Sequence, residues 1–205
     1  IRHSSSVTYL HPLAQWNGRI TFFTNCFVSQ ILLDGRRAIG VQTANGPVYA
    51  ERELILCCGA FDTPKLLMLS GIGPADHLRE VGIAVKHHLP GVGENLLDHP
   101  EGVVNWEASR PVPQETTQLW ELGLFAFTQP GLAAPDLMFH FGTEPFDMNT
   151  APLGYSTTTN GFALTPNVAR PQSQGTVRLR SANPAEPPRI DVRYFTDPVG
   201  HEEKG

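Results

Sequence analysis

A histidine and a glutamate stand two positions apart in the short segment His99-Pro100-Glu101-Gly102. In an extended backbone, side chains two positions apart project to the same side, so the imidazole and the carboxylate would share one face. Two ionisable groups on one face, beside a glycine-rich turn, could line a pocket. The alternative is a surface loop in which both groups are solvated. Asp98 could orient the His99 ring, as could any backbone carbonyl.

A second histidine, His140, lies in the apolar run Leu137–Gly142, between two phenylalanines. A histidine in such a run is more often a hydrogen-bonded structural residue than a catalyst. Aromatic side chains also stand in Glu115–Phe127, whose pattern predicts a helix, and aromatics on such a helix most often pack in a core. On the residues alone, none of these side chains is assigned to a site.

The elements that could position a site begin with Leu54–Cys58, an apolar run with the length and composition of a buried strand. Gly59 and Ala60 then remove side-chain bulk where the chain turns. A helix is predicted over Lys65–Leu69, and Pro64 suits its first turn because no backbone N–H is needed there. Asp62 or Thr63 can cap this helix, and Ser70-Gly71 ends it with a glycine that can take positive φ.

A strand, a small-residue turn and a capped helix start together present backbone N–H groups to an anion, typically the phosphates of a nucleotide. An ordinary strand–turn–helix crossover fits the same pattern and is the more common unit. Geometry alone does not decide between the two.

The rest of the chain divides into an α/β part and a sheet-rich part, with a boundary near Asp98. The first part is predicted to open with a short helix over Ser4–Leu10 that stops before Pro12. Asp34-Gly35 and Asn45-Gly46 predict hairpin turns of an antiparallel meander. Its strands are predicted at 19–25, 27–33, 38–43 and 47–50, followed by a helix at 74–81 and a strand at 83–85. The second part reads VVNWEA, LMFHFG, FALTPN, TVRLRS and IDVRYF, which predicts a mostly antiparallel sheet.

Composition excludes several classes of function. At 205 residues, with 40% hydrophobic and 17% charged residues, the chain is globular. The formal charge of −5 argues against nucleic acid as a partner, and no apolar run approaches a membrane span. Three cysteines do not make a disulfide framework, so we expect the reducing cytoplasm. No Cys/His spacing resembles that of a zinc site, so we expect no metal.

Two motifs give the chain a family resemblance. The stretch GAFDTPKLLMLSGIG at 59–73 resembles the second signature of the glucose–methanol–choline (GMC) flavin oxidoreductases. The stretch PGVGENLLDH at 90–99 also resembles that family. Downstream, HPEGVV, PDLMFHFG, EPFDMNT, NGFALTPNV, GTVRLRS and RYFTDP resemble the bacterial choline oxidases within the family, and less closely the mitochondrial-type choline dehydrogenases.

The resemblance implies roles for individual residues. Glu101 matches the carboxylate that pairs with the trimethylammonium group of choline, and Trp120 and Phe146 match aromatics of the substrate cavity. His140 matches an active-site histidine that helps to hold the substrate alkoxide oxygen, and His99 also lines the site. Cofactor-binding positions implied by the same alignment are Val28, Cys58, Gly59, Ala60, Asn95 and Asp98, with FAD as the cofactor.

The implied reaction oxidises choline through betaine aldehyde to glycine betaine, with hydride passing to flavin N5 and O2 reduced to hydrogen peroxide. The implied architecture is part of an FAD-binding domain at 1–97, followed by part of an antiparallel-sheet substrate domain at 98–205. The family's N-terminal G-x-G-x-x-G and C-terminal histidine motif are not in the chain. We therefore expect an internal fragment that alone neither retains FAD tightly nor oxidises choline, and whose full-length parent is a homodimer. The alternatives are a fragment of a choline dehydrogenase or of another GMC alcohol oxidoreductase, and a truncated, non-catalytic binding or structural module.

Overall fold

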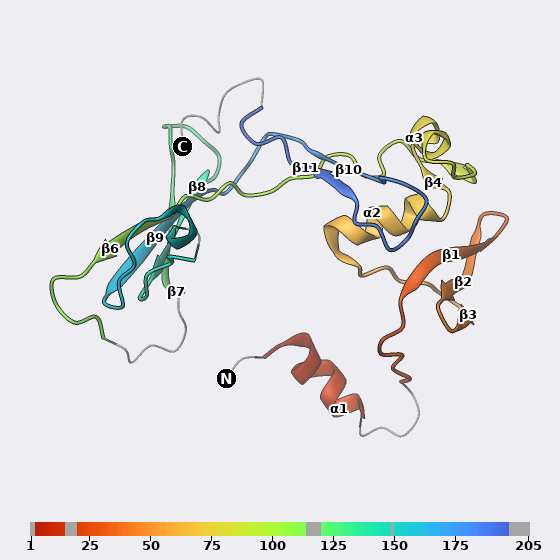
Figure 1. The fold of residues 1–205 in the computed structure, drawn as a ribbon, viewed down its shortest axis with the longest axis horizontal. Coiled ribbons are helices and arrows are strands. Elements are labelled where there is room, and N and C mark those ends of the chain that lie inside the picture. The colour runs from red at the N-terminus through yellow and green to blue at the C-terminus, as the bar shows by residue number, and fades with distance from the viewer. Residues whose placement is uncertain (1–2, 15–19, 114–119, 149, 197–205) are drawn as a thin grey trace. The chain divides into compact units, whose positions relative to one another are not determined.

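The computed structural model describes residues 3–14, 20–113, 120–148 and 150–196 (Figure 1). The chain separates into two compact units, Ile1–Cys57 with Asn183–Ala185, and Cys58–Ala182 with Glu186–Gly205. The domain boundary that the sequence predicts near Asp98 stays a prediction, because it concerns the domains of a longer protein.

The first unit is built on an antiparallel three-stranded sheet, β1-β2-β3. Its strands are β1 (Val28–Asp34), β2 (Arg37–Thr43) and β3 (Gly46–Tyr49). Gly35 and Gly46 have φ of 56° and 108°, the left-handed region that the two predicted hairpin turns require. The local turn chemistry therefore predicted this meander correctly.

Two predictions for the first unit are wrong. The opening helix does not stop before Pro12, because the π-helical turn η1 (Ser6–Leu10) continues directly into α1 (His11–Ala14). Pro12 then falls in the first turn of α1, where a missing N–H is tolerated. The predicted strand at 19–25 also fails, because residues 20–25 pair with no described strand and Asn25 turns the chain with a φ of 54°.

The second unit contains α2 (Gly59–Leu69), α3 (Ala75–Glu80), and a parallel pair formed by β4 (Ile72–Gly73) and β5 (His87–His88). Met68 of α2 and Leu78 of α3 are fully buried, and they pack with Val92 and Leu179 in one hydrophobic core. Burial of these apolar side chains is what holds two short helices in place.

The structure corrects several bounds in this region. Leu54–Cys58 is not a strand and is largely exposed, since no described strand lies beside it to accept its backbone hydrogen bonds. The helix begins at Gly59 rather than near Lys65, so Pro64 lies inside α2 instead of in its first turn. The strand predicted at 83–85 is displaced to β5, where Gly73 offers a parallel partner. Gly71 ends α2 with a φ of 85°, as predicted.

The sheet-rich part of the second unit is a four-stranded antiparallel sheet of order β6-β9-β8-β7. Its strands are β6 (Val104–Glu107), β7 (Trp120–Ala126), β8 (Leu137–Gly142) and β9 (Gly161–Val168). A short 3-10 helix, η2 (Ala151–Leu153), stands between β8 and β9, and β10 (Thr176–Arg178) pairs with β11 (Arg189–Asp191). This sheet confirms the predicted fold class.

One element of the sheet was predicted wrongly. The helix expected over Glu115–Phe127 is the edge strand β7, whose described part starts at Trp120; residues 115–119 lie outside the described residues. β7 pairs with β8 from Trp120 opposite Gly142 to Ala126 opposite Leu137, with one register shift between Trp120 and Leu122. The hydrogen bonds of this long-range pairing outweigh the local helical preference of the segment.

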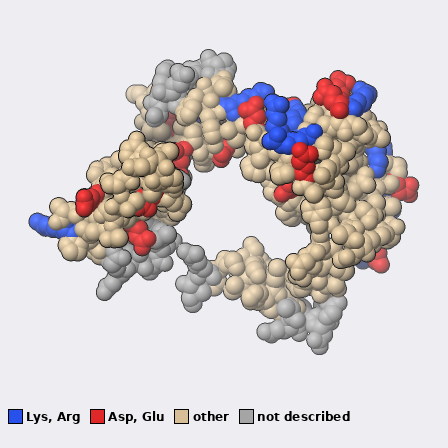
Figure 2. All heavy atoms as spheres, viewed as in Figure 1, with Lys and Arg blue, Asp and Glu red and all other residues tan. Residues whose placement is uncertain are grey.

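Charged side chains are unevenly spread over the view in Figure 2, where blue basic groups gather in the region that Figure 1 labels β10 and β11. Acidic groups lie among them, and Arg178 pairs with Glu94 while Arg193 pairs with Asp191. The described residues include no helix with the length and apolar character that crossing a bilayer requires.

Candidate functional site

Four side chains that the sequence singled out lie together on the four-stranded sheet. Glu101 Oε1 is 3.4 Å from His140 Nδ1, and both side chains are a little over one-third exposed. The ring of Trp120 lies 5.6 Å from that of His140 and 5.4 Å from that of Phe146, measured between centroids. A carboxylate, an imidazole and two aromatic rings therefore form one open cluster.

Strand register brings these residues together from distant positions in the chain. Glu101 forms an isolated antiparallel bridge with Asn167, and His140 pairs with Thr165 two residues earlier on β9. Because residues two apart on a strand share a face, Glu101 and His140 project to the same side of the sheet. Thr165 Oγ1, which is buried, lies 3.5 Å from His140 Nδ1 and limits how that ring can turn.

The aromatic part of the cluster is held by backbone contacts. The Phe146 N–H donates to Asn105 Oδ1 at 3.0 Å, and Asn105 Nδ2 donates to the Phe146 carbonyl at 3.3 Å. Trp120 lies over Gly142, where a Cβ atom would come within 3.0 Å of the indole ring. Position 142 must therefore stay small for the Trp120 ring to reach His140.

Among the described residues, no hydrogen bond, ion pair or ring contact joins His99 to this cluster. Its backbone N–H donates to Asp98 Oδ1 at 3.0 Å. The other carboxylate oxygen of Asp98 accepts a hydrogen bond from the Tyr194 hydroxyl. This hydrogen bond, followed by burial, raises the pKa of Tyr194. Asp98 thus ties together two segments of the chain rather than orienting the His99 ring.

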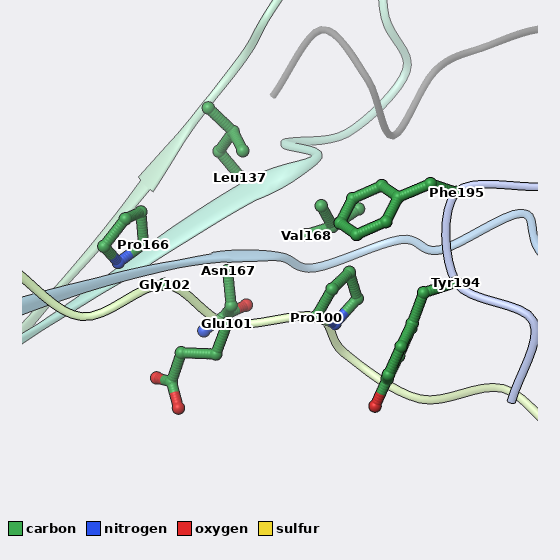
Figure 3. Close-up of a pocket in the computed structure, with 9 residues that line it drawn as sticks. All are labelled: Pro100, Glu101, Gly102, Leu137, Pro166, Asn167, Val168, Tyr194 and Phe195. Atoms are coloured by element: carbon green, nitrogen blue, oxygen red, sulfur yellow. The ribbon is translucent and has the colours of Figure 1, made fainter. Parts of the chain in front are cut away.

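A cavity of about 490 Å³ lies beside Glu101 (Figure 3). It is lined by Pro100, Glu101, Gly102, Leu137, Pro166, Asn167, Val168, Tyr194 and Phe195. Figure 3 shows the apolar side chains of Leu137, Val168 and Phe195 on one side of the paired strands, and the Glu101 carboxylate pointing away from them. Glu101 therefore belongs both to the lining of this cavity and to the polar cluster with His140.

The positions implied to bind a cofactor fall at backbone features suited to an anion. Cys58 is the N-cap residue of α2, and its side chain accepts no hydrogen bond from the first backbone N–H groups of this helix. Gly59 has a φ of 81°, is exposed, and a Cβ atom at this position would have no neighbouring atom within 4 Å. Ala60 follows in the first turn. These features fit a pyrophosphate, because N–H groups without a side-chain cap and the missing side chain of Gly59 allow close approach.

For the remaining positions implied to bind the cofactor, the structure gives only their backbone setting. Asn95 adopts a φ of 57°, a left-handed conformation that asparagine tolerates, and stands next to the bridge between Leu96 and Gly175. Val28 begins β1 in the first unit.

Comparison with protein families matches residues 1–101 to the GMC oxidoreductases. The chain belongs to the GMC oxidoreductase family. Choline oxidase of Arthrobacter globiformis is 52% identical over 208 residues, which cover 98% of this chain and 38% of that protein. Mitochondrial choline dehydrogenase of Homo sapiens is 37% identical, covering 95% of this chain and 37% of that protein. This GMC chain thus spans about two fifths of the length of the curated relatives it matches.

Solved structures agree with the family. Pyridoxine 4-oxidase from "Mesorbium loti" superposes with a TM-score of 0.84 at 25% identity, covering 97% of this GMC chain and 40% of that chain. A formate oxidase superposes with a TM-score of 0.72 at 24% identity, covering 85% and 40% respectively, and shows the fold alone. The fold described above is therefore the GMC fold in part.

Sequence reasoning missed three polar residues that shape the candidate site. Thr165 and Asn167 are buried on β9, and Asn105 holds the backbone of Phe146. The sequence carries no signal for the first two, because only the structure shows that both lie on the buried register of Gly161–Val168. A buried polar residue in an alternating strand indicates a hydrogen-bonding or binding role.

Proposed function

We propose that the full-length protein carrying this chain is an FAD-dependent alcohol oxidoreductase that oxidises choline to betaine aldehyde and glycine betaine. The observation that carries the proposal is the Glu101 carboxylate beside the Trp120–His140–Phe146 cluster. A quaternary ammonium group cannot donate a conventional hydrogen bond, so its receptors are a negative charge and the faces of aromatic rings. The likeness to a choline oxidase and to choline dehydrogenases supports the same substrate.

Each residue of the cluster has a role in this proposal. Glu101 holds the trimethylammonium group by charge, while Trp120 and Phe146 present ring faces and exclude water from it. His140 holds the alcohol oxygen and favours its deprotonated form, because an imidazole nitrogen can donate to an alkoxide. His99 is retained as a candidate residue at the edge of this site.

FAD is the cofactor we assign, with Cys58, Gly59 and Ala60 receiving its pyrophosphate at the start of α2 and with Val28, Asn95 and Asp98 as further contacts. When bound, FAD would accept a hydride from the alcohol carbon and pass the electrons to O2, yielding hydrogen peroxide. The chain's own contribution is to orient the alcohol and balance its charges. We also propose a cytoplasmic homodimer for the full-length protein.

A choline dehydrogenase is the alternative within the same family, supported by the 37% identity to the human enzyme. It would share the Glu101 cluster and differ in electron acceptor. Measuring hydrogen peroxide against the reduction of an artificial quinone acceptor separates the two. A GMC enzyme for a neutral alcohol is a weaker candidate, because a neutral substrate gives no reason for a carboxylate among aromatic rings.

The test is Glu101→Gln in the FAD-loaded full-length protein, with steady-state kinetics on choline. Loss of a charged contact of this kind is worth about 1.5 to 3 kcal/mol, so we expect KM for choline to rise roughly 10- to 100-fold. The matched control is Glu107→Gln, since Glu107 is an exposed glutamate on the neighbouring strand β6. Choline kinetics that change equally in both variants, or in neither, would remove the support for choline.

A further inference from the structure

Asn167 of β9 is a buried amide with an unmet hydrogen-bonding requirement. Asn167 is only 5% exposed, and its Oδ1 accepts no hydrogen bond from any described residue. A buried polar atom without a partner destabilises the fold, so native structures contain few of them. Such an atom beside a candidate binding site calls for a functional explanation.

The position of Asn167 relates it directly to Glu101. The two residues face each other in an isolated antiparallel bridge. The hydrogen bonds on either side of it run from the Gly102 N–H to the Pro166 carbonyl at 2.8 Å and from the Val168 N–H to the Pro100 carbonyl at 3.1 Å. Glu101 and Asn167 are thus a pair without hydrogen bonds between their own backbones, the kind in which opposing side chains approach most closely.

The amide and the carboxylate also project the same way. Figure 3 shows the side chains of Asn167 and Glu101 directed to one side of the strands, away from Leu137, Val168 and Phe195. His140 lies on that side as well, because it pairs with Thr165, two residues before Asn167. Carboxylate, imidazole and amide therefore share one face.

Among the described residues, His140 is the hydrogen-bonding partner of the Glu101 carboxylate, at a long 3.4 Å. In the proposed reaction His140 is needed at the alcohol oxygen, so the carboxylate would lose that partner when substrate binds. An amide whose oxygen no other described residue holds is free to turn its NH2 group to the carboxylate. Being neutral, it would fix the carboxylate without cancelling the charge that attracts the cation.

We propose that Asn167 is a positioning residue that holds the Glu101 carboxylate for the cationic head of the substrate. This inference rests on the proposed function. It concerns recognition of the cation and not the chemistry at the alcohol carbon. Asn167 therefore separates charged from neutral substrates of the same shape.

The experiment compares Asn167→Leu with the parent in the FAD-loaded full-length protein. Leucine keeps the branched four-atom skeleton of the asparagine side chain and removes both its donor and its acceptor. Three quantities are measured: KM for choline, KM for its uncharged carbon analogue 3,3-dimethylbutan-1-ol, and the Kd for tetramethylammonium by titration calorimetry. We expect the first and third to rise about tenfold, as for one hydrogen bond to a charged group, and the second to change less than twofold.

A double-mutant comparison shows whether Asn167 acts through Glu101. On a Glu101→Gln background, Asn167→Leu should add less than twofold to the Kd for tetramethylammonium. Equal losses for choline and for the neutral analogue, or an undiminished loss on the Glu101→Gln background, would overturn the inference. If the leucine variant does not fold, Asn167→Ala supplies the same comparison. A parent enzyme that binds neither choline nor tetramethylammonium would instead refute the proposed function.

Discussion

Gly93 is a position where one added methyl group should measurably destabilise the fold. Its φ is 78°, and a Cβ atom there would lie 2.2 Å from the Val177 carbonyl oxygen and 2.9 Å from Arg178 Nη1. Gly93 also accepts hydrogen bonds through its own carbonyl, from the Val177 N–H at 2.7 Å and from Arg178 Nη1 at 2.9 Å. The backbones of Gly93 and β10 are therefore in direct contact.

Gly93→Ala would disturb each of these features. A left-handed φ costs an L-residue about 1 to 2 kcal/mol. Strand β10 would also have to retreat by about 1 Å to restore an ordinary contact distance, which weakens two hydrogen bonds worth about 1 kcal/mol each. We expect a total loss of about 3 to 4 kcal/mol in the free energy of unfolding. For a chain of this length that lowers Tm by roughly 6 to 15 °C.

The assay is thermal unfolding of the chain followed by circular dichroism, with Gly91→Ala as the matched control. Gly91 is two residues away, has no left-handed φ, and has no atom within 4 Å of a Cβ. Alanine there should change stability by less than about 0.5 kcal/mol. If Gly93→Ala melts within a degree of the parent, or if Gly91→Ala loses as much, the close backbone contact does not govern stability here.

Two further predictions concern pH. The hydrogen bond to Asp98 raises the pKa of Tyr194 above the ordinary 10.0. The stability that this hydrogen bond contributes is therefore complete below pH 10 and is lost as pH rises through the raised pKa. Urea unfolding midpoints should fall in that pH range in the parent and stay level in Tyr194→Phe. Burial, and then Arg178, lower the pKa of His77 below 6.5, and its Nε2 accepts the Leu179 N–H at 3.1 Å. The stability contributed by neutral His77 is therefore complete above pH 6.5 and is lost as pH falls through the lowered pKa. Midpoints between pH 7 and pH 4 should therefore drop more steeply in the parent than in His77→Gln, and parallel slopes would contradict the assignment.

Local chemistry accounts for the parts of the fold that the sequence predicted well. The two hairpin glycines, and Gly71 and Gly82 after the helices, all take positive φ where the chain turns. At these positions the conformational freedom of glycine decides the structure without help from distant residues. The alternating segments after Val103 likewise predicted an antiparallel sheet, because period-two patterning shows which face is buried.

The wrong secondary-structure predictions fall on segments whose conformation depends on residues far away in the sequence. The segment that became β7 carries the residue types of a helix and is a strand because β8 pairs with it. Leu54–Cys58 has the composition of a strand and forms none, because a strand exists only when a neighbour accepts its backbone groups. Neither outcome can be read from the residues of the segment itself.

The candidate site divides in the same way. The residues alone left Glu101 and His140 as unassigned ionisable groups 39 positions apart, and the family resemblance suggested that both serve one site. The structure places them in contact, whereas the expected shared role of His99 stays a prediction. Asn167 escaped notice because its importance depends on strand register, which the pattern of one strand does not reveal.

The strand order β6-β9-β8-β7 has a consequence for how the protein is made. During synthesis, Val104 of β6 cannot pair until Leu164 of β9 has been made, about 60 residues later. At typical translation speeds of about 5 to 20 residues per second, that interval lasts roughly 3 to 12 seconds. During this time Glu101 has emerged but its partner Asn167 has not. The nascent chain therefore carries an unmatched strand and an incomplete binding face, and this interval is when a ribosome-associated chaperone would have most to protect.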